Sequence, residues 1–299
     1  MGILVVGSMG LDTVETPHGK VTDALGGAAT YFSVSASYFT KVNLVAVVGN
    51  DFPKQHIDLL KKHKIDVDGL QQVEGKTFRW SGHYMKDLNE AQTLNTELNV
   101  FAGFDPQLPE KYTKAEYVFL ANIDPVLQLK ALKQVKKPKL IALDTMNFWI
   151  QGKLKELKAT LRHIDILVIN ETEAKMLACE KNLMKAAQKI FGLGPKGLVI
   201  KRGEYGAMHV TKNSEFALPA LPLEKVCDPT GAGDTFAGGF MGFIAKSNKV
   251  DDQTLKKAVV YGSVMASYNV EDFSLNKLKA LNSGMINDRF NKFKKLTAF

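Results

Sequence analysis

The sequence predicts an α/β fold, with a doubly wound, mostly parallel sheet flanked by helices and a small antiparallel β-sheet beside it. Six short apolar runs rich in β-branched residues alternate with helix-like segments over most of the 299 residues. One region breaks this alternation with a period of two. The 45% hydrophobic content is enough to form a large core. No internal repeat or low-complexity linker interrupts the pattern, which predicts a single domain over residues 1–299.

The six apolar runs are expected to form the buried strands of the main sheet. They are residues 3–6, 43–48, 117–121, 140–143, 166–169 and 197–200. Strands covered on both faces are continuous apolar runs rather than alternating ones. This composition therefore favours parallel strands with helices on either side.

The segments between these runs are expected to form helices. They are residues 28–39, 52–63, 125–135, 171–178 and 182–191. Asp51 is expected to be the N-cap of the second helix, with Pro53 in its first turn.

The region that breaks the alternation is expected to form a lid. Residues 77–85 follow a period of two, and no helix pattern separates the strands between about 70 and 101. With residues 12–22 they would make a small sheet inserted early in the domain, a suitable place for a lid over an active site. A hairpin that merely extends the main sheet is the alternative. An exposed lid edge could also pair two subunits into a homodimer.

Composition limits the partners and the compartment. The 39 Lys and Arg residues exceed the 31 Asp and Glu residues, and the net charge of +8 suits a polyanionic small substrate such as a nucleotide. The basic residues are scattered, and their densest patch, 287–296, is interpreted as a solvated helix face, so no nucleic acid is expected. The distant pair Cys179 and Cys227 suggests no disulfide framework. No apolar run approaches a membrane span of about 18 residues, and we expect a cytoplasmic protein.

Three sequence patterns resemble known binding sites but do not meet their requirements. Gly75-Lys76-Thr77 lacks the earlier glycine of a P-loop and precedes a strand pattern rather than a helix. Residues 7–10, which follow the first strand, lack the GxGxxG of a dinucleotide site, which argues against an oxidoreductase. The six histidines show no metal-ligand spacing.

The stretch DPTGAGDTFAGGFMGF, residues 228–243, carries the clearest chemistry. Its phenylalanines recur at helical spacing, which predicts a buried helix that begins after Gly231, Ala232 and Gly233. Small residues leave the free N–H groups at the helix start open to an anion, and the helix dipole favours negative charge there.

Asp234 is the one carboxylate in this turn. A carboxylate repels a phosphate, so it is a poor binder, but it can accept a proton from a hydroxyl that lies between the two. The backbone N–H groups would then neutralise charge on the transferred phosphoryl group. The alternative is an ordinary helix N-cap.

At this point the sequence resembles a family. GAGDTFAGGF resembles the second signature of the ribokinase (PfkB) family of carbohydrate and nucleoside kinases, and LGGAATYFSVSASYF, residues 25–39, resembles the first. NETE at 170–173 is similar to the family's NxxE, and VIKRGEYGA at 199–207 to its KxGxxG. The resemblance spans residues 7 to about 268.

The resemblance implies roles around the acceptor. Asp234 would be the base, and residues 231–233 the anion hole. Asp12, Gly26 and Gly27 would hold the phosphate acceptor. The alternatives are that Asp12 caps a turn and that the two glycines only begin a helix.

It also implies roles around the nucleotide. Asn170 and Glu173 would organise Mg²⁺, with Glu173 acting through water. Lys201, Gly203 and Gly206 would lie along ATP. The alternatives are a capping box for Asn170 and Glu173 and a solvated strand end for Lys201.

Two positions need comment. Tyr31 stands where the family usually has Asn, five residues after Gly26, which suggests a different and more aromatic acceptor pocket. Asp228 lies where the family often binds a monovalent cation such as K⁺.

In the region expected to form the lid, Trp80, Tyr84 and Phe101 would either stack on a base or form lid core.

The resemblance implies an ATP-dependent kinase, a phosphotransferase that acts on the primary hydroxyl of a sugar or nucleoside, with lid closure to exclude water. The alternative is a catalytically silent nucleotide- or sugar-sensing protein on the same fold.

Overall fold

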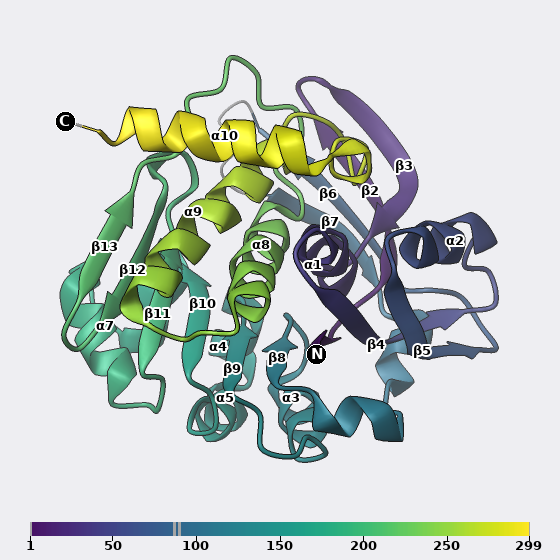
Figure 1. The fold of residues 1–299 in the computed structure, drawn as a ribbon. Coiled ribbons are helices and arrows are strands. Elements are labelled where there is room, and N and C mark those ends of the chain that lie inside the picture. Colours follow the sequence, from purple (N-terminus) through teal and green to yellow (C-terminus); the bar gives the residue numbers. More distant parts are fainter. Residues whose placement is uncertain (1, 86–87, 89–90, 299) are drawn as a thin grey trace.

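The computed structural model describes residues 2–85, 88 and 91–298 (Figure 1). Two sheets are present in this part of the chain. A nine-stranded sheet has the order β13-β12-β11-β10-β9-β8-β1-β4-β5, and a four-stranded sheet has the order β3-β2-β6-β7. The expected α/β architecture, with a large, mostly parallel sheet and a small separate one, is confirmed.

The main sheet contains all six expected strands, paired in parallel. Its strands are β1 (Gly2–Val6), β4 (Lys41–Gly49), β5 (Ile65–Val73), β8 (Tyr117–Leu120), β9 (Leu140–Asp144), β10 (Ile166–Asn170), β11 (Gly197–Lys201), β12 (Ala207–Thr211) and β13 (Glu215–Leu218). The apolar-run criterion missed β5, β12 and β13. β5 and β13 are the edge strands, and β12 lies next to β13. All three include half-buried or exposed residues, so they are not continuous apolar runs.

Helices cover both faces of the main sheet (Figure 1). Ile3 and Val5 of β1 join one core, whereas Leu4 and Val6 join the other. The first core is covered by α1 (Ala28–Ser37), α2 (Lys54–Lys62), α8 (Ala232–Ser247), α9 (Asp252–Asn269) and α10 (Ser283–Leu296). The second is covered by α3 (Pro125–Leu132), α4 (Asn147–Gly152), α5 (Leu154–Leu161), α6 (Glu171–Ala178) and α7 (Leu183–Phe191). The five helices expected between the strands are therefore confirmed.

The capping role expected for Asp51 is wrong. Helix α2 begins after Pro53, and no side chain caps it. The Asp51 carboxylate instead accepts hydrogen bonds from the Thr77 backbone N–H at 2.7 Å and its hydroxyl at 2.6 Å, and it pairs with Arg79 at 2.9 Å. A charged guanidinium and two donors compete better for this carboxylate than one helix N–H group.

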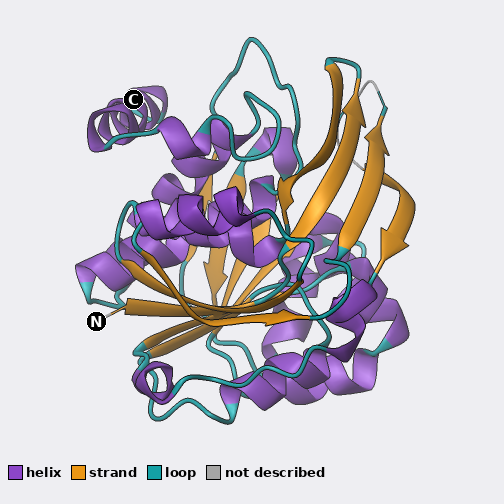
Figure 2. Ribbon diagram, turned by 90° about the vertical axis from the view of Figure 1, so that its right-hand side faces the viewer, coloured by secondary structure: helices purple, strands orange, loops and turns teal. Residues whose placement is uncertain are grey.

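The four-stranded sheet projects beyond the main sheet (Figure 2). Its strands are β2 (Gly10–Thr16), β3 (Gly19–Gly26), β6 (Arg79–Tyr84) and β7 (Ala91–Glu97). Two antiparallel hairpins, β2-β3 and β6-β7, are joined by parallel pairing of β2 with β6. Because this sheet does not pair with the main one, the alternative of a hairpin that extends the main sheet is wrong. Residues 70–73 of the expected lid belong to β5, at the edge of the main sheet.

Short 3₁₀ helices lie at Asn99–Gly103, Glu110–Lys114, Gly203–Tyr205 and Leu278–Ala280. Among the described residues, no helix combines the length and the apolar character needed to cross a bilayer.

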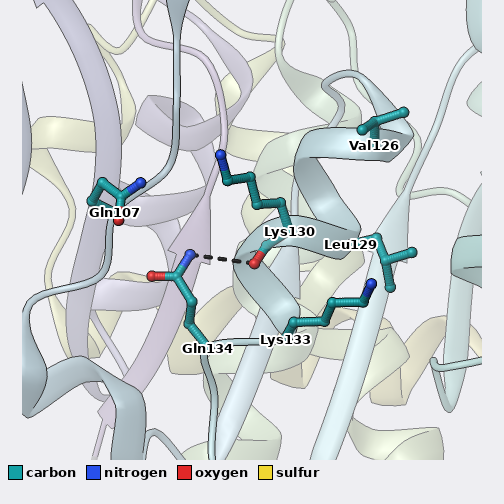
Figure 3. Close-up of a pocket in the computed structure, with 6 residues that line it drawn as sticks. All are labelled: Gln107, Val126, Leu129, Lys130, Lys133 and Gln134. Atoms are coloured by element: carbon teal, nitrogen blue, oxygen red, sulfur yellow. Dashed lines mark hydrogen bonds between the residues drawn. The ribbon is translucent and has the colours of Figure 1, made fainter.

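A surface hollow of about 470 Å³ lies beside α3 (Figure 3). It is lined by Gln107, Val126, Leu129, Lys130, Lys133 and Gln134. The Gln134 amide donates to the Lys130 carbonyl at 3.2 Å, and Lys130 pairs with Asp105 at 2.6 Å. The hollow includes none of the residues expected in the site.

Candidate active site

Polar residues end three neighbouring strands of the main sheet. Asp144 is the last residue of β9, Asn170 of β10 and Lys201 of β11. Asn170 and Lys201 are register partners. Ligands of open parallel sheets bind outside the carboxyl ends of the strands, so this edge is the expected place for a site.

The start of α8 has an open N-terminus. Gly231 is its N-cap residue, with a φ of 72°, and no side chain caps the helix. A Cβ on Gly231 would overlap the ring of Tyr31, and one on Gly233 would lie 2.9 Å from the Lys201 ammonium. Side chains are therefore excluded at Gly231 and Gly233. The Ala232 N–H already donates to the Pro229 carbonyl at 3.1 Å, and the N–H groups of the two glycines are open to an anion.

Asp234 lies in the first turn of α8. Because the N-cap is Gly231 and no side-chain cap bond forms, the alternative of an N-cap role for Asp234 is wrong. The pKa of Asp234 is raised to about 7, mainly by loss of solvation and also by the charge of Asp144, while Lys201 opposes the shift. Such a carboxyl can change its protonation state near neutral pH, as a general base must.

Asp12 meets the two glycines that precede α1. It is 5% exposed and accepts a hydrogen bond from the Gly27 backbone N–H. A Cβ on Gly26 would overlap the Asp12 carboxylate, and Gly27 has a φ of 93°. Burial raises the pKa of Asp12 to about 7, and the charge of Asp234 contributes. The three predicted acceptor residues, Asp12, Gly26 and Gly27, are therefore brought together.

Lys201 is the central cation of the site. Its ammonium pairs with Asp144 at 3.1 Å, and its side chain is only 18% exposed, so the alternative of a solvated strand end is wrong. Burial lowers the pKa of Lys201, but Asp144, Glu173 and Asp234 outweigh this effect and raise it above its usual value.

Asp144 was missed by sequence reasoning. It is 4% exposed, and its carboxylate also accepts a hydrogen bond from the Thr145 backbone N–H at 2.8 Å. The signal was present, because an acid directly follows the apolar run Leu140–Leu143 at the carboxyl end of a strand.

Asn170 and Glu173 form the capping box that was one of the two alternatives. The Glu173 backbone N–H donates to Asn170 Oδ1 at 2.7 Å, and the Asn170 backbone N–H donates to Glu173 Oε2 at 2.9 Å. Burial raises the pKa of Glu173 to about 7, Lys201 opposes the shift, and Asp144 adds to it. Their role toward magnesium stays a prediction.

Gly203 and Gly206 lie in the turn that follows Lys201. Their φ angles are 55° and 95°, which favour glycine. A Cβ on Gly206 would overlap the Leu218 carbonyl oxygen, and the Gly206 carbonyl accepts from the Arg202 N–H at 2.8 Å. The tight turn thus follows Lys201 directly in the chain. Its contact with a nucleotide stays a prediction.

Asp228 holds the segment that leads into α8. It is 1% exposed, and its two oxygens accept from the backbone N–H groups of Thr230 at 2.9 Å and Ser274 at 3.3 Å. This bonding gives Asp228 a structural role, and its role toward K⁺ stays a prediction.

The aromatic residues of the lid region have different surroundings. Tyr84 is 7% exposed, and its hydroxyl lies 3.3 Å from the Thr230 hydroxyl, beside the start of α8. Trp80 donates to Thr93 at 3.2 Å, within the four-stranded sheet. Phe101 stacks on Phe104, with 5.7 Å between the ring centroids, as in an ordinary apolar cluster.

Curated proteins with similar sequences include kinases of nucleosides and of sugars. A cytidine kinase of Thermococcus kodakarensis is 32% identical over 258 residues, which cover 84% of this chain and 91% of that protein. A ribokinase of Schizosaccharomyces pombe is 26% identical over 282 residues, covering 84% and 88%.

Solved structures share the fold. The Methanocaldococcus jannaschii nucleoside kinase, an archaeal member of the ribokinase family, superposes with a TM-score of 0.77 at 22% identity and covers 98% of this chain and 99% of its own. A putative ribokinase II of E. coli in complex with ATP and Mg²⁺ gives a TM-score of 0.79 at 17% identity, covering 99% of both chains. The sequence also matches the model of the pfkB family carbohydrate kinases over residues 3–279. The chain therefore belongs to the pfkB family of carbohydrate kinases.

Proposed function

We propose that this protein is an ATP-dependent kinase that transfers the γ-phosphoryl group to a primary hydroxyl of a sugar or nucleoside. The observation that carries the proposal is the pairing of an uncapped helix N-terminus at Gly231 with the carboxylate of Asp234 in the same turn. An anion site and a base whose pKa is about 7 thereby share one turn.

The residues divide the work of phosphoryl transfer. Asp12 orients the acceptor, and Asp234 accepts the proton of its hydroxymethyl group. The N–H groups of residues 231–233 and the Lys201 ammonium, 2.9 Å from the position of a Cβ on Gly233, neutralise the charge on the transferred group.

The donor set fits Mg²⁺. The capping bond of Glu173 uses Oε2, so Oε1 can bind the ion or its water, and the carboxylate of Asp144 lies near enough to influence the Glu173 pKa. Carboxylate oxygens suit this hard cation, which retains water ligands. Mg²⁺, when bound, supplies positive charge to the phosphates of ATP. The putative ribokinase II solved with ATP and Mg²⁺ supports the same pair of cofactors for this chain.

The test is product formation from ATP and Mg²⁺ with a panel of sugars and nucleosides. We expect one class of acceptor to yield ADP and a phosphorylated product in equal amounts. Asp234→Asn should lower kcat about 10³-fold while ATP still binds, because the base acts only in the transition state. Binding of ATP and acceptor without any product from the native protein would contradict the kinase and favour a sensing role. Turnover of the variant at the native rate would refute the assignment of the base.

A further inference from the structure

Asn269 is the last residue of α9, and its side chain lies at the start of α8. The two helices pack closely, because a Cβ on Gly262 of α9 would lie 2.9 Å from the Phe236 carbonyl oxygen of α8. Asn269 is 0% exposed. A buried amide from α9 therefore meets the segment that leads into Gly231–Asp234, which is the proposed anion-binding turn with its acid.

The Asn269 side chain forms a hydrogen bond on each side of this turn. Its Nδ2 donates to the Thr230 carbonyl at 2.8 Å, and its Oδ1 accepts from the Thr235 hydroxyl at 3.2 Å. Thr230 directly precedes the turn, and Thr235 directly follows it. One amide thus ties together the two ends of the turn.

The bond to Thr230 determines the direction of the Gly231 N–H group. The Thr230 carbonyl and the Gly231 N–H belong to one planar, trans peptide unit. The carbonyl and the N–H of such a unit point in opposite directions. Because the carbonyl is bonded to Asn269, the Gly231 N–H is turned away from the Asn269 side chain and stays open to an anion.

The bond to Thr235 holds the residue next to the proposed base. The Thr235 backbone N–H donates to the Gly231 carbonyl at 2.8 Å, and its carbonyl accepts from the Ser35 hydroxyl of α1 at 2.7 Å. The bond to Asn269 holds the Thr235 side chain as well. Asp234 is attached to a residue whose backbone and side chain are both held in place.

An uncharged amide suits the position of Asn269. It supplies one donor and one acceptor, so it satisfies a carbonyl and a hydroxyl at once. An apolar side chain would leave both of these groups unpaired in the core, and a carboxylate would offer the Thr230 carbonyl no donor.

We propose that Asn269 is a positioning residue for phosphoryl transfer, which sets the direction of the Gly231 N–H relative to the carboxylate of Asp234. This inference rests on the proposed kinase function. Asn269 acts through the backbone of the turn, so its loss should misplace groups that work in the transition state. The effect should therefore appear in kcat rather than in the binding of ATP or acceptor.

The first test is steady-state kinetics with ATP, Mg²⁺ and the best acceptor. We expect Asn269→Leu to lower kcat about tenfold or more and to leave both KM values within about threefold. Thr235→Val removes only the hydroxyl partner of Asn269 and should lower kcat about threefold or more. Thr235→Ser keeps that hydroxyl and should retain kcat within about twofold.

The second test measures affinity rather than activity. Aluminium fluoride with ADP stands in for the transferred phosphoryl group and probes the turn directly. We expect Asn269→Leu to weaken the binding of ADP with aluminium fluoride, Mg²⁺ and acceptor about tenfold, and to leave the binding of ADP alone within about threefold.

Thr160→Val is the matched control for Thr235→Val. Thr160 of α5 is 0% exposed, and its hydroxyl donates to the Pro125 carbonyl at 2.9 Å, on the other face of the main sheet. Its loss should lower the free energy of unfolding, measured by urea titration, about as much as the loss at Thr235 and should not change kcat.

Two results would overturn the role of Asn269. One is a kcat within about twofold of the native value in folded Asn269→Leu and Thr235→Val. The other is an equal loss of affinity for ADP alone and for ADP with aluminium fluoride, because this would indicate general disruption of the site. If Asn269→Leu does not fold, Thr235→Val compared with Thr160→Val decides. Absence of product from every acceptor with the native protein would instead refute the kinase itself.

Discussion

Helices α6 and α8 both begin beside Lys201, but their N-termini are built in opposite ways. In α6, Asn170 and Glu173 cap each other reciprocally, so two of the first N–H groups are already bonded. In α8, Gly231 has no side chain to cap the helix, and of the first N–H groups that of Ala232 donates to the Pro229 carbonyl at 3.1 Å. A helix whose N–H groups are bonded to its own side chains has little to offer an anion. This difference supports the proposal that the phosphoryl group binds at α8, whereas α6 supplies a carboxylate.

Gly231→Ala, which alters the N-terminus of α8, should have the largest effect on kcat among the variants considered for this comparison. The substitution places a Cβ at a φ of 72° and against the ring of Tyr31, so the turn must move. Displaced N–H donors no longer match the developing charge, and we expect kcat to fall about 10²-fold or more. Steady-state kinetics with a titration of ATP binding measures it. Gly152→Ala is the matched control, because a Cβ there has nothing within 4 Å. Equal kcat values for both variants would contradict the anion role of the α8 turn.

The pH dependence of activity should sharpen the assignment of the base. Asp12 and Asp234 have pKa values raised to about 7, so both are largely protonated in the free protein below that pH. A base must be deprotonated to accept a proton, so kcat/KM should rise about tenfold between pH 6 and pH 8. A profile that is flat, or that falls over this interval, would exclude a carboxyl base with a raised pKa.

Glu173→Gln distinguishes the capping role of Glu173 from its proposed role in Mg²⁺ binding. Glutamine at this helix position can keep the capping bond but carries no charge. We expect the Mg²⁺ concentration for half-maximal rate to rise several-fold, because a carboxylate ligand is lost. Mg²⁺ titration at saturating ATP and acceptor is the measurement. If the requirement does not change, Glu173 acts in the cap alone.

Asn170→Ala should have the smallest effect. It removes the cap of α6 and should lower the free energy of unfolding by about 1 kcal/mol, measured by urea titration. Asn182 is the matched control, because it caps α7 in the same way through the Lys185 N–H. Equal stability losses with equal kcat values for the two alanine variants would leave Asn170 with no function beyond the cap.

Sequence alone could predict the parts of the site that are contiguous. The proposed anion-binding turn and its acid occupy four consecutive residues, Gly231–Asp234, and the capping box of α6 is equally local. The Lys201–Asp144 pair joins residues 57 positions apart, and the contact of Tyr31 with Gly231 joins α1 to α8. Such contacts depend on the order of the strands and the packing of the helices. The spacing of residues along one sequence does not reveal either of them.

The error at Asp51 has the same origin. Its position before Pro53 matches a capping pattern, but the segment that leads into β6 places Thr77 and Arg79 at its carboxylate. The propensity of an Asp to cap a helix predicts its role poorly when a charged residue distant in sequence lies close enough to pair with it.

The most direct test of the account is a crystal structure of the protein with Mg²⁺, ADP, aluminium fluoride and its best acceptor. Aluminium fluoride stands in for the transferred phosphoryl group. We predict that it lies within hydrogen-bond distance of the N–H groups at the start of α8, with the acceptor hydroxyl between it and Asp234. Aluminium fluoride bound at the start of α6, or an acceptor hydroxyl turned away from Asp234, would contradict the account.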